Sequence, residues 1–254
     1  MMFSTQWSVN ELAKRQFLFK LNGNGSIFSV LIVLQIIGTV LMGGSATSTS
    51  TSTYTEETNI LSFNFSAISN DGQVGLTLFW AFIIGFVLTS PAQRNESFTF
   101  VTNRLTFQLA NFYFFCTAAL FGGVTTVLLG SVMKIFAMFN VNTVMQTNGL
   151  LSSPLDFFSQ IFVMTAYTLL LMLVGYTLGS FIQFSKLFIM LFALVYIVFT
   201  QTTFFTIGGK NIDLLHFFYG ETSILLFTLK ILLAVAVLFG ASFWVTNRLE
   251  VRNP

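Results

Sequence analysis

Six long apolar runs, separated by shorter polar segments, dominate the chain. They cover residues 26–44, 73–91, 109–132, 158–182, 186–207 and 223–246. Each is close to the roughly 20 mainly apolar residues that an α-helix needs to cross a bilayer. Only a short polar step around Gln183, Ser185 and Lys186 separates the fourth run from the fifth, which indicates a tight reversal. The pattern predicts an all-α, polytopic membrane protein with about six transmembrane helices.

A different pattern precedes the first apolar run. Ser8 and Glu11 have the spacing of a helix-capping box. An apolar stripe and three nearby basic residues follow: Val9, Leu12, Ala13, Phe17 and Leu21, then Lys14, Arg15 and Lys20. We expect residues 8–21 to form an amphipathic helix along the membrane surface, with the basic side chains near the headgroups. The alternative is a basic tail without helical structure.

Two polar segments carry further patterns. Residues 45–58 are a Ser/Thr run followed by Glu56 and Glu57, with few groups to bury, so we expect a mobile loop.

In the link 92–108, Phe98, Val101 and Leu105 recur at helical spacing. Arg94 and Arg104 bracket this apolar face, although Phe98 and Phe100 keep a strand possible. An apolar face on a polar link needs a burial partner, either the bilayer surface or another protein.

Composition excludes a water-soluble domain. Hydrophobic residues make up 54% of the chain, charged residues 8%, and the mean hydropathy is +0.80. A soluble domain carries about a quarter of its residues as charges. Residues 1–254 are therefore expected to form a single transmembrane domain: an interfacial elbow helix at 1–25, the six-helix region at 26–246 and a tail at 247–254.

The distribution of Lys and Arg predicts the orientation. Six spans put both termini on one side of the membrane. That side would carry Lys14, Arg15, Lys20, Arg94, Arg104, Lys186, Arg248 and Arg252. The opposite side would carry only Lys134 and Lys210. The positive-inside rule predicts cytoplasmic termini in a cell membrane. The net charge of +2 is too small to indicate a nucleic-acid partner.

Chemistry-bearing motifs are scarce. His216 and Cys116 are the only residues of their kinds, so we expect no metal site and no internal disulfide. Gly175 and Gly179 form a GxxxG that is a candidate helix-packing site. Lys230, inside the last run, and Gln201, in the loop 200–222 that we expect to dip back toward the membrane, are candidate cavity residues; for Lys230 the alternative is snorkelling to the interface. Catalysis or use of an ion gradient would need paired acids at mid-membrane, which are missing.

The order of parts resembles the permease subunits of ABC-2-type exporters, of the compact bacterial kind. An interfacial basic helix leads into six spans, with a link between the second and third and a semi-buried loop before the sixth. The segment from Ser90 to Leu105, with its hydroxyl groups and arginines, looks like the coupling segment of that family. The similarity covers the layout of the whole chain, while the family has no strict residue signature.

The resemblance implies partners and a role. Residues 94–106 would dock on a separate ABC ATPase subunit, through the residues Arg94, Glu96, Phe98, Val101, Arg104 and Leu105. ATP and Mg²⁺ would bind to that subunit, and this chain would bind no cofactor. Two permease chains, alike or different, would move an amphipathic or hydrophobic peptide, antibiotic or lipid. The rivals are a non-transporting immunity or assembly protein, then an ATP-independent channel or carrier, and last a membrane enzyme.

Overall fold

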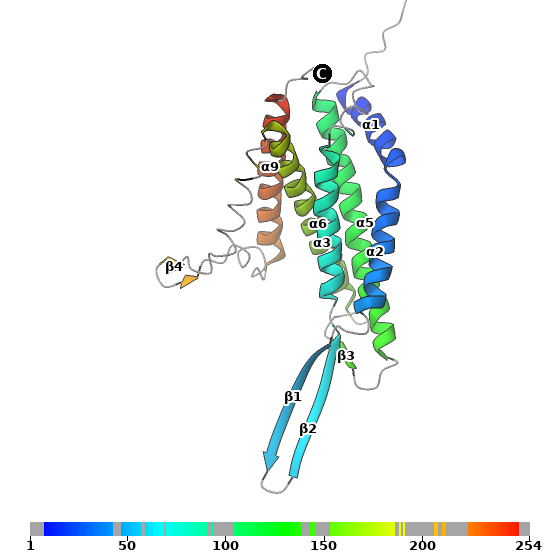
Figure 1. Ribbon diagram of the computed structural model, residues 1–254, viewed down its shortest axis with the longest axis vertical. Coiled ribbons are helices and arrows are strands. Elements are labelled where there is room, and N and C mark those ends of the chain that lie inside the picture. The colour runs from blue at the N-terminus through cyan, green and yellow to red at the C-terminus, as the bar shows by residue number, and fades with distance from the viewer. Residues whose placement is uncertain are drawn as a thin grey trace, which may run out of the picture.

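Long helices, with a two-stranded hairpin beyond one end of them, make up the described part of the computed structural model (Figure 1). The structure describes residues 8–42, 47–56, 59–68, 70–90, 93, 104–138, 143–145, 153–185, 188, 190, 206–207, 210–211 and 223–248. The helices are α1 (Val9–Gly23), α2 (Ser26–Met42), α3 (Asp71–Leu88), α5 (Arg104–Met138), α6 (Pro154–Phe184) and α9 (Ile224–Arg248). The strands are β1 (Thr47–Glu56), β2 (Asn59–Ile68), β3 (Thr143–Met145), β4 (Thr206–Ile207) and β5 (Lys210–Asn211).

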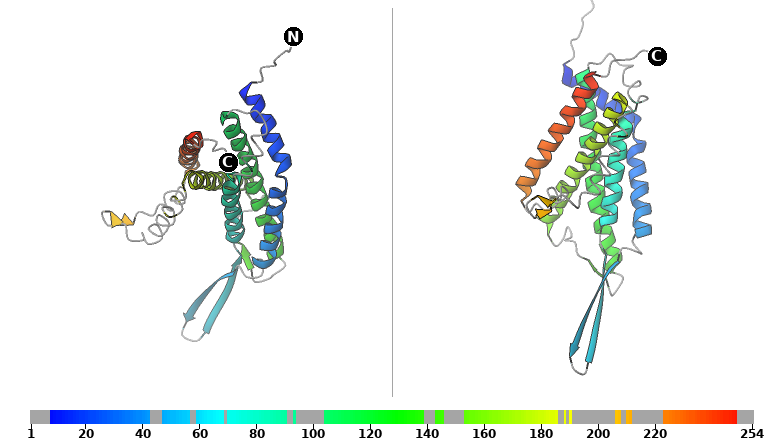
Figure 2. Two further views of the ribbon diagram at one scale, coloured as in Figure 1. Left: turned by 45° about the horizontal axis from the view of Figure 1, so that its top comes forward. Right: turned by 60° about the vertical axis from the view of Figure 1, so that its left-hand side comes forward.

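The helices from α2 to α9 lie side by side, and α1 meets α2 at a bend of 48° (Figures 1 and 2). Helix α1, the start of α5 and the last turn of α9 share one end of the bundle, here called the α1 end. Strands β1 and β2 project from the opposite end, here called the hairpin end. One end of the bundle thus carries the helix α1, and the other carries the hairpin.

The helical membrane architecture is confirmed. Within the described residues, α3, α6, the 105–133 part of α5 and the 224–246 part of α9 are long and apolar enough to cross a membrane. The bent α1–α2 pair brings the number from 4 to 5. The predicted fifth run, 186–207, lies mostly outside the described residues. A total of six spans and cytoplasmic termini therefore stay predictions.

The helix predicted over 8–21 forms, and the side that it buries includes Ala13 of the predicted apolar stripe but also two polar residues. The Ser8 hydroxyl accepts from the Glu11 amide at 3.3 Å, and the Glu11 carboxylate accepts from the Ser8 amide at 3.2 Å, which completes the capping box. The buried residues are Ala13, Gln16 and Lys20, spaced to face α5. The expectation that Lys20 lies among the headgroups is therefore wrong, because α1 packs on protein along this face.

The Ser/Thr segment also differs from expectation, because most of it is strand β1. It pairs with β2 in an antiparallel register from Thr47↔Ile68 to Glu56↔Asn59. Alternating β-branched threonines favour an extended backbone, and β2 supplies the partner. The end of β2 pairs in parallel with β3, at Ser66↔Thr143 to Ile68↔Met145. Among the described residues, the segments long and apolar enough to cross a membrane are all helical, as predicted, and β1, β2 and β3 lie between them. Strand β4 falls at the end of the predicted run 186–207.

The core lies where α3, α5 and α6 meet. Large side chains fill it, among them Trp80, Phe114, Phe115, Met172 and Tyr176. Helices α3 and α6 make the most extensive helix contact. Helix α9 packs on α6 through Phe227, Ile231 and Val235, and leaves most of its surface exposed. This exposed apolar surface suits contact with the apolar tails of lipids.

Candidate functional site at the α1 end of the bundle

A buried lysine lies between α1 and α5. Lys20 is 3% exposed, and its ammonium donates to the Asn111 carbonyl oxygen Oδ1. The same ammonium lies 4.0 Å from the centroid of the Phe107 ring, one turn before Asn111. Burying a charge is costly unless polar or π partners replace the lost water. The two α5 side chains provide such partners, so they fix the position of α1.

The hydrogen bonds continue from α5 to α6. Asn111 Nδ2 donates to the Tyr176 hydroxyl at 2.9 Å, and that hydroxyl donates to Gln108 Oε1 at 3.0 Å. All four polar side chains are buried. The lysine can only donate, which orients the Asn111 amide with its oxygen toward α1 and its nitrogen toward α6. We call Lys20, Asn111, Tyr176 and Gln108 the α1–α5–α6 cluster.

The link between α3 and α5 is held at its start by two further contacts. Gln93 Nε2 donates to Asn24 Oδ1 at 3.2 Å. Asn24 caps α1, because its backbone amide donates to the Lys20 carbonyl at 2.9 Å. Near the end of α6, Gln183 Nε2 donates to the Thr89 carbonyl. The start of the link is thus tied to α1 and α6, the same helices that the cluster joins to α5.

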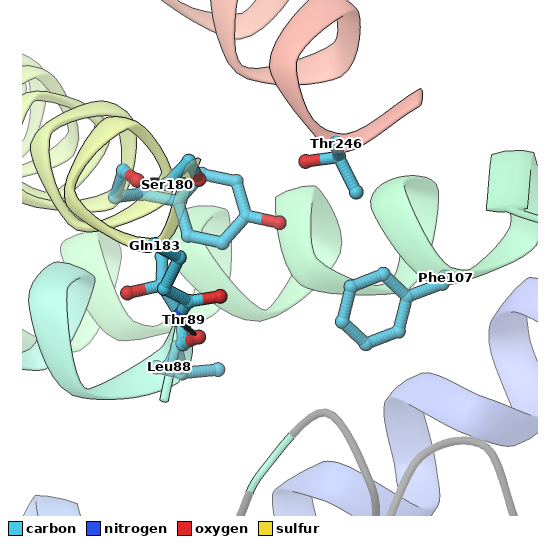
Figure 3. Close-up of a pocket in the computed structure, with 7 residues that line it drawn as sticks. Leu88, Thr89, Phe107, Ser180, Gln183 and Thr246 are labelled. Carbon is cyan, nitrogen blue, oxygen red and sulfur yellow. Dashed lines mark hydrogen bonds between the residues drawn. The ribbon is translucent and has the colours of Figure 1, made fainter. Parts of the chain in front are cut away.

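A small cavity adjoins the cluster (Figure 3). It has a volume of about 20 Å³, which is room for about one water molecule. Four helices line it: α3 with Leu88 and its C-cap Thr89, α5 with Phe107, α6 with Tyr176, Ser180 and Gln183, and α9 with Thr246. In Figure 3, Gln183 lies against Thr89, while Phe107 and Thr246 approach from other helices. Most of the cavity wall is apolar despite these hydroxyl and amide groups, and the cavity is too small for an amphipathic cargo.

A second polar network joins α2, α3 and α5 toward the hairpin end. Gln35 Nε2 lies within hydrogen-bond distance of the hydroxyls of Thr77 (3.1 Å), Thr125 (3.2 Å) and Thr126 (3.1 Å), to which its two hydrogens can donate. Gln73 Nε2 donates to the Gln35 carbonyl at 3.1 Å and to the Thr39 hydroxyl at 2.9 Å. In the sequence the threonines are only scattered polar positions. Folding gathers them around two glutamines, and hydrogen bonds of this kind hold membrane helices together.

The sequence carries a signal for both networks that a search for charged residues misses. Gln35 and Gln73 lie in or at the edge of apolar runs, and so do Gln108 and Asn111. An amide in a membrane helix needs a partner on a neighbouring helix. Such amides could be marked as interhelical contacts, although their partners could not be named without the fold.

Most of the predicted coupling residues lie outside the described residues. These are Arg94, Glu96, Phe98 and Val101, together with the candidate cavity residue Gln201. Arg104 is the first residue of α5, and Leu105 follows it with 50% of its side chain exposed. Leu105 therefore belongs to the long helix that carries the cluster.

The other candidates are placed by the structure. Gly175 and Gly179 face α3, where a Cβ on Gly175 would meet the backbone of Phe82 and Phe86 and one on Gly179 would meet Thr89. Lys230 is partly exposed in the first half of α9, away from the cavity at the α1 end. Among the described residues, no group of three His, Cys, Asp or Glu side chains could hold a metal ion.

Comparison with known proteins identifies no family. No family model matches the chain, and neither a curated protein nor a solved structure is detectably similar to it.

Proposed function

We propose that this chain is the transmembrane permease subunit of an ATP-driven exporter in a cell membrane, powered by separate ABC ATPase subunits. One observation carries the proposal: the α3–α5 link begins in contact with α1 and α6, and the helix that follows it is joined to the same two helices. A partner that displaced the link would therefore act on three helices at once.

The energy for transport would come from that partner. Within the described residues there is no metal-binding group, and the described spans carry no pair of acidic residues. An ion-coupled carrier usually needs ionisable side chains at mid-membrane. Binding energy from an ATPase with ATP and Mg²⁺ can instead switch the packing of helices between two arrangements. This chain would need no cofactor of its own.

The pathway would lie between two permease chains, identical or different. Glycine contacts close the α3–α6 interface, and the glutamine–threonine network closes the α2–α3–α5 interface. The cavity beside the cluster accommodates only about one water. An amphipathic or hydrophobic peptide, antibiotic or lipid would therefore pass along a face exposed in the single chain. Large apolar faces of α2 and α9 are available for such a contact.

The test is co-purification with the ATPase encoded beside this chain. Both would be expressed together and purified in detergent, and ATPase activity would be measured in the shared peak. Arg104→Glu and Phe98→Asp should abolish co-elution, because both change the segment expected to dock. Lys134→Glu is the matched control, since Lys134 lies near the other end of the same helix as Arg104; it should leave co-elution intact.

A non-transporting immunity or assembly protein is the second candidate. The closed α2–α3–α5 network favours it, because a protein that only packs against others needs a static bundle. Such a protein would purify alone and tolerate Arg104→Glu as well as Lys134→Glu. That outcome would refute the exporter proposal.

A further inference from the structure

The contacts at the α1 end form two attachments on the α3–α5 link. The first attachment, at the start of the link, consists of Gln93 on Asn24 and of Gln183 on the Thr89 carbonyl. The second, just after the link, is the α1–α5–α6 cluster. Both attachments reach the same two helices, α1 and α6. A displacement at the start of the link would therefore act on α1 and α6 as well.

We propose that Lys20 and Tyr176 are positioning residues of a clamp. This clamp makes α1, the start of α5 and the end of α6 move as one body when the link is displaced. The inference rests on the proposed function, in which a partner ATPase displaces the link. It goes further by naming the residues that would carry the movement from the link into the membrane.

The chemistry of the cluster explains why it would transmit both a push and a pull. The hydrophobic attraction between apolar surfaces is non-directional, so it favours contact without specifying a bonding geometry. A buried ammonium favours one position, because moving it away from Asn111 and Phe107 would break a charge-assisted hydrogen bond and a cation–π contact. Asn111 also bonds Tyr176, so a displacement of α1 acts on α6 through two directional contacts. The clamp therefore favours a geometry that an apolar contact would leave unspecified.

The joint between α1 and α2 gives the clamped body a place to turn. The two helices meet at a bend of 48°, around Asn24 and Gly25. On the α1 side, Gly23 has no described neighbour within 4 Å of the position that a Cβ would occupy. Hinges are often short stretches at the ends of elements, where a few residues absorb changes in backbone angles. Asn24 lies in this joint and also accepts the hydrogen bond from Gln93, so the link acts directly on it.

The test measures the distance between α1 and α6 in the complex with the ATPase. Spin labels would be placed at Leu18→Cys and Phe184→Cys, which are 53% and 50% exposed, in a Cys116→Ser background. Distance distributions would be recorded without nucleotide and with ATP, Mg²⁺ and vanadate. With the clamp intact, the α1–α6 distance should stay narrow and unchanged in both states, because both helices belong to one body.

Two variants break the clamp, and one serves as control. Lys20→Met removes the charge but keeps the length of the side chain, and Tyr176→Phe removes only the hydroxyl. Both should broaden the distribution and let it shift with nucleotide. Lys14→Met removes a lysine from the exposed side of the same helix and should behave as the unsubstituted protein. Tyr176→Phe keeps the test informative if Lys20→Met does not fold.

The outcomes separate the two proposals. Absence of ATPase co-elution would refute the proposed function, whatever the distances are. Co-elution with a narrow, unchanged α1–α6 distance in both clamp variants would refute the clamp and leave the permease proposal standing. Co-elution with a distance that broadens and shifts in the clamp variants, but not in Lys14→Met, would support the clamp.

Discussion

Replacing Gly175 by alanine should separate α6 from α3. The ideal Cβ position on Gly175 lies 3.1 Å from both the Phe82 carbonyl carbon and the Phe86 nitrogen, and still closer to the Phe82 oxygen. Backbone atoms cannot rotate away as a flexible side chain can. The two helices would have to move apart until the added methyl group cleared the Phe82 oxygen. That displacement would weaken the most extensive helix contact in the described bundle.

The magnitude follows from two opposing terms. Overpacking a tight contact costs about 1–3 kcal/mol. Alanine in a helix is favoured over glycine by about 1 kcal/mol, which offsets part of that cost. Gly75→Ala in α3 is the matched control, because no described atom lies within 4 Å of its Cβ position. Both variants share the propensity gain, so the difference between them isolates the steric cost.

The assay is thermal unfolding in detergent, followed by the loss of the monodisperse peak in size-exclusion chromatography. Gly175→Ala should unfold about 2–12 °C below Gly75→Ala, at about 2–4 °C for each kcal/mol in a chain of this size. Equal midpoints for the two variants would refute the argument. They would mean that α3 and α6 are not in backbone contact at Gly175.

Three further predictions test other parts of the structure. Gln35→Leu should destabilise the protein by about 1–2 kcal/mol in the same thermal assay, because the Thr126 hydroxyl and its neighbours lose their donor; no loss of stability would argue against the network. Ser8→Ala should cost α1 about 1 kcal/mol and speed hydrogen exchange in its first turn, while Ser8→Asp should restore the cap; equal exchange in both variants would exclude the cap. In intact cells carrying Cys116→Ser, a membrane-impermeant maleimide should label Thr51→Cys in the hairpin but not Asn22→Cys in α1; the reverse pattern would overturn the predicted cytoplasmic termini.

The sequence predicted best what depends on local pattern. The apolar runs that became α2, α3, α5, α6 and α9 were all anticipated, and the Ser8–Glu11 capping box set the start of α1. These features need only the periodicity and chemistry of neighbouring residues. The ends of the helices were less exact: α5 begins at Arg104 and continues to Met138, beyond the predicted run 109–132.

The sequence predicted least well where a residue's partner lies far along the chain. From its sequence neighbours, Lys20 is expected at the headgroups. In the structure it is bonded to Asn111 of α5, which lies 91 residues later in the chain. The Ser/Thr run by itself predicts a loop, whereas in the structure it forms a strand whose backbone pairs with β2. Glycines inside the apolar runs also differ in ways that the sequence does not show: Gly175 lies against the backbone of α3, whereas no described atom lies within 4 Å of the Cβ position of Gly240.

The amino-acid sequence by itself determined that this protein is helical and embedded in a membrane, because 8% charged residues cannot cover a water-facing surface and six apolar runs are long enough to cross a bilayer. Only the tertiary structure decided which polar groups meet. Hydrophobicity selects the environment of a helix but hardly its rotation or its neighbours, which depend on close packing and hydrogen bonds between distant segments. For that reason the α1–α5–α6 cluster, on which the functional proposals depend, became visible only in the folded chain.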